Sequence, residues 1–281
     1  MSNKLLRTYT GSVSVVTGAA SGIGRGLAEE LTRRGGEVIL ADLQIELAEG
    51  AAAAIRASGG KAQAIKLDVT DASAVDALLR NTVEHAGRLD YLFNNAGIGI
   101  AGPIERYTLE DWNRIIDINF RGVIHGVHSA YPIMQRQGFG HIVNTASLAG
   151  LVPSAGMVAY TATKHAVVGL SSSLRPEAAL AGIRVSVLCP GLVRTAILED
   201  GGKYGKTYAA GIPVEQQRKM IEQLRPMAPE QFAHQTLNAV ARNAAIIVVP
   251  SWWGLMWWMN RFSPSLVMFL MRKGLEQTIS A

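Results

Sequence analysis

Short apolar runs alternate with longer segments of helical periodicity along most of the chain. The apolar runs have the length of buried strands and cover 12–17, 37–41, 62–67, 89–93, 141–146 and 183–189. The segments between them carry apolar residues at helical spacing, and several end at glycines. Because strands that are joined through helices lie parallel with right-handed crossovers, the pattern predicts an α/β fold. We expect a doubly wound parallel sheet of about seven strands with helices on both faces.

Small and polar residues follow these strands at the points where each strand ends. They are Gly18–Gly24, Asp42, Asp68, Asn95–Gly97 and Ser147. The carboxyl ends of parallel strands meet at one edge of the sheet, and ligands bind in the crevice beyond that edge. The sequence therefore predicts a ligand site built from several strand ends.

The first of these segments has the spacing Gly18-x-x-x-Gly22-x-Gly24 and lies between a strand and a helix. Glycines allow the backbone to approach a pyrophosphate, and the amides at a helix N-terminus favour negative charge. The spacing differs from the commoner Gly-x-Gly-x-x-Gly fingerprint. Taken alone, the motif also fits a tight turn without a ligand.

Asp42 ends the second strand. A carboxylate at this position suits the hydroxyls of an adenosine ribose and would repel a 2′-phosphate, so NAD is favoured over NADP. Arg25, in the first turn of the helix that follows the glycines, complicates this assignment because a guanidinium can bind a phosphate. We interpret Arg25 as a solvated residue.

Tyr160 and Lys164 are four residues apart, which places them on one face of a predicted helix. A free phenol has a pKa of about 10, and a nearby ammonium group lowers that pKa. Ser147 follows a strand and offers a hydroxyl to the same substrate oxygen. The three residues suggest proton transfer to or from a carbinol or carbonyl. Tyr-x-x-x-Lys also occurs by chance on exposed helices, so the pair alone does not establish catalysis.

The composition narrows the class of protein. The 281 residues are 48% hydrophobic and 17% charged, which indicates a substantial core. The net charge is +5, but the basic residues are scattered, so we expect no nucleic-acid partner. We also expect no metal site, because no cluster has metal-ligand spacing. A single cysteine, Cys189, and the lack of a signal-peptide pattern favour a cytoplasmic protein.

Taken together, residues 10–250 resemble the short-chain dehydrogenase/reductase family in its single-domain form, with a Rossmann-type sheet. The likeness rests on motifs that stand in the family's order. They are Thr17-Gly18-x-x-x-Gly22-Ile23-Gly24, Asp68, Asn94-Asn95-Ala96-Gly97, Asn119, Ser147, Tyr160-x-x-x-Lys164 and Pro190-Gly191. The resemblance implies one domain over 1–250, followed by an extension over 251–281.

The resemblance also implies roles for these residues. Tyr160 would be the general acid/base, Lys164 would lower its pKa and bind the nicotinamide ribose, and Ser147 would orient the substrate oxygen. Asn119 would support a water that leads to the lysine. The remaining implied contacts are with the dinucleotide, and they involve Gly18, Ser21, Gly22, Ile23, Gly24, Asp42, Leu43, Asp68, Val69, Asn95, Ala96, Gly97, Pro190, Gly191, Val193 and Thr195.

We expect residues outside the family motifs to select the substrate. The residues that flank the catalytic group are mostly apolar, and we expect Leu148, Ala149, Leu151, Pro153 and Met157 to line the pocket. The segment 196–226 has the composition of a mobile lid. An apolar pocket favours a bulky lipophilic alcohol or ketone, such as a steroid, a retinoid or a long-chain secondary alcohol.

The family also implies a homodimer or homotetramer, with a dimer face formed by two long helices over about 108–137 and 157–181. The tail over 251–273 holds four of the five tryptophans but is interrupted by Asn260, Arg261 and Pro264. These interruptions argue against a transmembrane span. We expect the tail to pack over the active site or across a dimer, with peripheral membrane attachment as the alternative.

The expected activity is an NAD-dependent interconversion of a lipophilic secondary alcohol and its ketone. One alternative is a 3-oxoacyl thioester reductase, against which Asp42 argues because such reductases usually take NADPH. A second alternative is a catalytically silent nucleotide-binding scaffold. The presence of Ser147, Tyr160 and Lys164 argues against a scaffold, because the fold alone does not require them.

Overall fold

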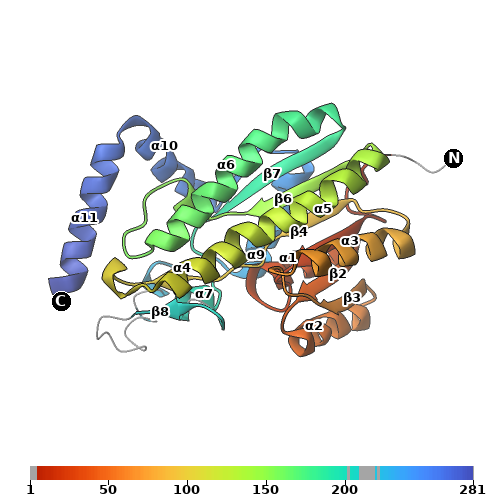
Figure 1. Ribbon diagram of the computed structural model, residues 1–281, viewed down its shortest axis with the longest axis horizontal. Coiled ribbons are helices and arrows are strands. Elements are labelled where there is room, and N and C mark those ends of the chain that lie inside the picture. The colour runs from red at the N-terminus through yellow and green to blue at the C-terminus, as the bar shows by residue number, and fades with distance from the viewer. Residues whose placement is uncertain (1–4, 201–202, 209–218, 220–221, 281) are drawn as a thin grey trace.

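The computed structural model describes residues 5–200, 203–208, 219 and 222–280 (Figure 1). A parallel sheet of seven strands forms the centre, in the order β3-β2-β1-β4-β6-β7-β9. These strands are β1 Val13–Thr17, β2 Glu37–Asp42, β3 Lys61–Lys66, β4 Tyr91–Asn94, β6 Gly140–Thr145, β7 Ile183–Pro190 and β9 Ile246–Val249. The predicted doubly wound sheet is confirmed. The strand order reverses between β1 and β4, which is where such sheets bind ligands.

Helices cover both faces of this sheet (Figure 1). One face packs against α1 Gly22–Arg33, α2 Ile45–Ala57 and α9 Pro229–Ala241. The other packs against α3 Ala72–Ala86, α5 Gly122–Gln137 and α6 Val158–Leu180. The further helices are α4 Leu109–Ile116, α7 Ile197–Asp200, α10 Gly254–Phe262 and α11 Pro264–Ser280, and a small second sheet pairs β5 Ile100–Ala101 with β8 Lys206–Thr207.

Local sequence explains why the helices begin and end where they do, and α3 is a clear example. Its first backbone N–H groups lack helical partners, and the Asp71 side chain accepts hydrogen bonds from two of them, those of Ser73 and Ala74. The helix ends at Gly87, whose φ of 74° is in the left-handed region that glycine tolerates.

The long helix expected over about 108–137 differs from the prediction. It is divided into α4 and α5 by a π-helical turn over Asp117–Arg121. Asn119 lies in this turn and is fully buried. Its side-chain amide donates to the carbonyl of Ile98 and accepts from the N–H of Ile98, at 2.9 and 2.8 Å. These bonds satisfy the buried amide and tie the turn to the segment after β4.

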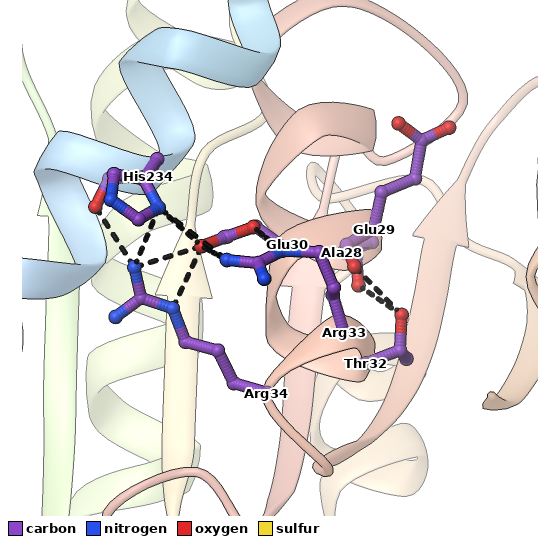
Figure 2. A network of polar contacts seen from close by, with 7 residues as sticks. All are labelled: Ala28, Glu29, Glu30, Thr32, Arg33, Arg34 and His234. Atoms are coloured by element: carbon purple, nitrogen blue, oxygen red, sulfur yellow. Dashed lines mark hydrogen bonds and ion pairs between the residues drawn. The ribbon is translucent and has the colours of Figure 1, made fainter.

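A polar network joins α1 to α9 and braces the helix that follows the glycine-rich turn (Figure 2). Glu30, which is 8% exposed, accepts hydrogen bonds from Arg33 and Arg34, and His234 Nδ1 of α9 lies 2.9 Å from Glu30 Oε1. Burial alone would raise the pKa of Glu30. The hydrogen bonds from Arg33, Arg34 and His234 outweigh burial and lower this pKa to about 2.

The tryptophan-rich tail folds as the hairpin α10–α11 at one end of the molecule (Figure 1). Trp253, Met256 and Trp257 pack against the apolar cluster that contains Val152 and Cys189. Among the described residues, no helix is both long and apolar enough to cross a membrane. Much of the segment predicted as a lid, 196–226, lies outside the described residues, and its described parts include α7 and β8.

Candidate active site

A cavity of about 1380 Å³ opens beyond the carboxyl ends of the sheet strands. Nearly all of the predicted site residues line it. They are Gly18, Ser21, Gly22, Ile23, Asp42, Leu43, Asp68, Val69, Asn95, Ala96, Gly97, Ser147, Leu148, Ala149, Pro153, Met157, Tyr160, Lys164, Pro190, Gly191, Val193 and Thr195. The tertiary structure therefore brings the separate motifs to one place.

Three predicted site residues do not line the cavity. Gly24 packs against the backbone of Gly18, and the side chain of Asn119 is fully buried. Leu151 was expected in the substrate pocket, but this prediction is wrong. Its side chain is buried in an apolar cluster, and its carbonyl accepts a hydrogen bond from Asn260 of α10.

The glycine turn forms one wall of the cavity, which we call the glycine wall (Gly18, Ser21, Gly22, Ile23 and Asn95). Gly18 and Gly22 have φ values of 65° and 54°, which disfavour other residues. A Cβ on Gly18 would lie 2.8 Å from Ala96 Cα, and one on Gly24 would overlap the Gly18 carbonyl oxygen. Side chains are thus excluded, and the bare backbone with its helix N-terminus fits a bound pyrophosphate.

Asp42 stands beside this turn, and two hydrogen bonds fix its carboxylate, one of them to the turn. One carboxylate oxygen accepts from the N–H of Ala20 and the other from the N–H of Gln44, each at 2.9 Å. Each oxygen keeps a lone pair for a ribose hydroxyl. Arg25 does not line the cavity, and its Nε donates to Glu29, as the interpretation of a solvated residue predicted.

Other strand ends complete this side of the cavity. Asn95 donates to the carbonyl of Thr17 at 3.1 Å, which ties the end of β4 to the glycine turn. Asp68 is exposed and accepts from the N–H and hydroxyl of Thr70, so its orientation is fixed by its own turn. These contacts fix both side chains where they line the cavity.

Ser147, Tyr160 and Lys164 meet within the same cavity. The Ser147 hydroxyl lies near the Tyr160 phenol and acts to lower its pKa. Lys164, which is 3% exposed, places its Nζ 5.5 Å from the centre of the Tyr160 ring and donates to the Thr145 carbonyl at 3.0 Å. A Cβ on Gly97 would lie 3.5 Å from this Nζ, so the ammonium group also lies close to Gly97. The hydroxyl, phenol and ammonium groups form one connected set.

Burial controls the protonation of this set. It raises the pKa of Tyr160, and the nearby Ser147 hydroxyl offsets only part of the increase. Burial lowers the pKa of Lys164 to about 8. We expected Lys164 to lower the pKa of Tyr160, and that expectation is wrong for this structure. The buried ammonium group donates to a backbone carbonyl, and loss of hydration dominates the phenol.

The apolar part of the cavity lining, which we call the apolar wall, comprises Leu148, Val152, Pro153, Met157, Trp253, Met256 and Met271. Three of these residues come from the tail, so the expected packing of the tail over the active-site region is seen. A Cβ on Gly191 would overlap the Trp253 ring, and this glycine therefore allows the indole to lie against the end of β7.

Sequence reasoning missed several lining residues. Asn113, Arg114 and Asp117 reach the cavity from α4 and the following turn, and Tyr204 reaches it from the segment before β8. They belong to no recognisable motif. Only the packing of α4 beside the cavity brings them to the site, and the sequence carried no signal for that arrangement.

Comparison with known proteins agrees with this geometry. Residues 12–203 match a protein-family profile described as short chain dehydrogenase. A 2,5-dichloro-2,5-cyclohexadiene-1,4-diol dehydrogenase of Sphingobium indicum is 39% identical over 197 residues, which cover 70% of this chain and 77% of that protein. A cyclohexanol dehydrogenase of an Acinetobacter species is 37% identical over 201 residues, which cover 71% and 78%.

The fold comparison points the same way. The crystal structure of a short chain dehydrogenase/reductase from Burkholderia phymatum, in complex with NAD, superposes with a TM-score of 0.81 at 31% sequence identity. The match covers 92% of this chain and 96% of the other. The matching profile spans more than half of the chain, and the cavity joins the glycine turn to Ser147, Tyr160 and Lys164. The chain therefore belongs to the short-chain dehydrogenase family of oxidoreductases.

Proposed function

We propose that the protein is an NAD-dependent dehydrogenase that interconverts a lipophilic secondary alcohol and its ketone. One observation carries the proposal. Ser147, Tyr160 and Lys164 line the same cavity as the glycine turn, Asp42 and the apolar wall. A dinucleotide site, a proton-transfer group and a surface for an apolar substrate thus share one space.

The glycine turn, Asp42, Asn95 and Lys164 would hold the dinucleotide, which supplies hydride transfer when bound. Asp42 favours NAD, because a carboxylate accepts ribose hydroxyls and repels a 2′-phosphate. The Burkholderia relative was solved with NAD, which supports the same choice.

The chain's own residues would move the proton. The Ser147 hydroxyl orients the substrate oxygen, and the Tyr160 phenol gives its proton to a ketone oxygen or, as phenolate, takes one from an alcohol. The raised pKa of Tyr160 keeps the phenol protonated at neutral pH. Ketone reduction should therefore be favoured at neutral pH, and alcohol oxidation should accelerate as the pH rises.

The apolar wall supports a lipophilic substrate. Leucine, proline, methionine and tryptophan side chains bind apolar surface and leave the hydroxyls of a sugar without partners. The two relatives compared above are named for the oxidation of cyclic alcohols, which supports a carbocyclic or similarly bulky substrate.

The test is turnover of a panel of hydrophobic alcohols and ketones with both NAD and NADP, together with Tyr160→Phe. Loss of the phenolic proton should lower kcat by about a thousandfold and leave the dissociation constant of NAD unchanged. Substantial activity of Tyr160→Phe would contradict the assignment. Turnover confined to 3-oxoacyl thioesters, or no turnover of any compound, would instead favour the two alternatives considered from the sequence.

A further inference from the structure

The outer face of the α10–α11 hairpin is apolar and exposed. Phe262 is 83% exposed, and half or more of the surface of Leu255, Trp258 and Phe269 is also exposed. Over 264–273 only Val267 is buried, although most of these residues are apolar. A contiguous apolar surface of this kind marks a site of interaction.

Basic side chains lie among the apolar residues of this face. The tail from 251 to 281 includes three basic side chains, Arg261, Arg272 and Lys273, and one acidic side chain, Glu276. The guanidinium of Arg261 lies 5.6 and 5.8 Å from the ring centres of Trp257 and Trp258, and the Lys273 ammonium lies 4.9 Å from that of Phe269. Cations held beside aromatic rings at the edge of an apolar face are typical of segments that lie in a membrane interface.

We propose that the α10–α11 hairpin docks the protein onto the surface of a bilayer that contains anionic phospholipids. The hairpin lies in the interface rather than across the bilayer, because none of the described helices has the length and apolarity for a span. Its aromatic and methionine side chains enter the acyl boundary, and its cations meet the phosphates.

A second copy of the chain fits this face less well. Two identical hairpins packed face to face would bring together two surfaces that each carry more basic than acidic side chains, three against one. An anionic lipid surface supplies the opposite charge everywhere along the face. Charge complementarity therefore favours an anionic lipid surface over a second copy of the chain.

The same hairpin also forms part of the cavity wall through Met256 and Met271. Docking would place this wall beside the lipid phase, where lipophilic compounds concentrate. This consequence for substrate entry rests on the proposed function, whereas lipid binding itself does not.

The test is co-sedimentation of the full chain with phosphatidylcholine vesicles, with and without phosphatidylglycerol. Phe262→Ser combined with Phe269→Ser should lower the partition coefficient at least about tenfold. Leu180→Ser is the matched control, because Leu180 is 93% exposed on α6, away from the hairpin, and its loss should change nothing.

Charge is tested separately with Arg261→Gln and Lys273→Gln. Each should lower partition into the phosphatidylglycerol vesicles about fivefold and have little effect with phosphatidylcholine alone. Lys61→Gln, an exposed change on β3, is the control. Lack of vesicle binding by the wild-type chain would overturn the proposal. So would an oligomer that dissociates in the Phe262 and Phe269 variant, which would assign the face to a second copy. Either result is independent of NAD-dependent turnover.

Discussion

The glycine wall and the apolar wall line one cavity but are built by different means. At Gly18 of the glycine wall, and at Gly24 which packs against it, backbone atoms approach so closely that a single added methyl group would collide with other backbone. On the apolar wall, the surface consists of flexible side chains, and three of them come from the tail. Backbone cannot shift without moving the strands, whereas methionine side chains adapt. If the proposed function is correct, the dinucleotide site is fixed and the substrate site is adjustable.

A methyl group added at Gly24, which packs against Gly18 of the glycine wall, should have the largest effect on binding. Gly24→Ala would force the glycine turn to shift, because its Cβ would overlap the Gly18 carbonyl oxygen. We expect NAD to bind about a hundredfold more weakly, measured by calorimetry. Gly50→Ala is the control, since its Cβ would meet nothing within 4 Å, and it should leave the affinity unchanged. If Gly24→Ala and Gly50→Ala bound NAD with equal affinity, close backbone packing would not fix the glycine wall, and the contrast with the apolar wall would not hold.

The network that braces the glycine wall should contribute to stability in a pH-dependent way. Glu30→Gln should lower the free energy of unfolding by about 2 kcal/mol near neutral pH, measured with urea, because two arginines lose a buried partner. The folded pKa is about 2 and the ordinary value 4.5. The stabilisation is therefore present above pH 4.5 and lost as the pH falls toward 2.

The control for this prediction is Asp76→Asn, which removes an exposed ion pair with Arg80. It should cost well under about 1 kcal/mol. A difference between wild type and Glu30→Gln that persists undiminished at low pH would show that the network acts through packing rather than charge.

Substitution of Asp42 should change the affinities for NAD and NADP by a smaller factor. Asp42→Asn should weaken NAD binding about tenfold and reduce the discrimination against NADP, because the repulsive charge is gone and an acceptor is lost. Arg25→Gln should leave the ratio of the two affinities unchanged, since Arg25 pairs with Glu29 outside the cavity. A wild-type preference for NADP would contradict the role given to Asp42.

The apolar wall should show the smallest effect. Met256→Ala should raise KM for a hydrophobic alcohol about fivefold and leave kcat and NAD affinity unchanged, because it removes apolar contact without touching the proton-transfer group. Met259→Ala, in the same helix but outside the cavity lining, should change neither constant. A loss of NAD affinity in Met256→Ala would mean that the two walls are not independent.

Sequence by itself determined the sheet, the polar residues at its strand ends and the three residues that we propose for proton transfer. Strand and helix periods are local properties, and the parallel topology forces strand ends to a common edge. Motifs far apart in the chain could therefore be assigned to one edge of the sheet from their order along the sequence alone. The glycine turn, Asp42, Ser147, Tyr160 and Lys164 all came from this reasoning, and they share the cavity.

Tertiary structure decided what depends on packing between distant segments. The π-helical turn at Asn119 follows from its bonds to Ile98, and the inward position of Leu151 follows from the apolar cluster around it. The raised pKa of Tyr160 follows from burial rather than from its spacing to Lys164. Periodicity cannot register such effects, because desolvation and side-chain contact are set by residues that have no fixed spacing along the chain.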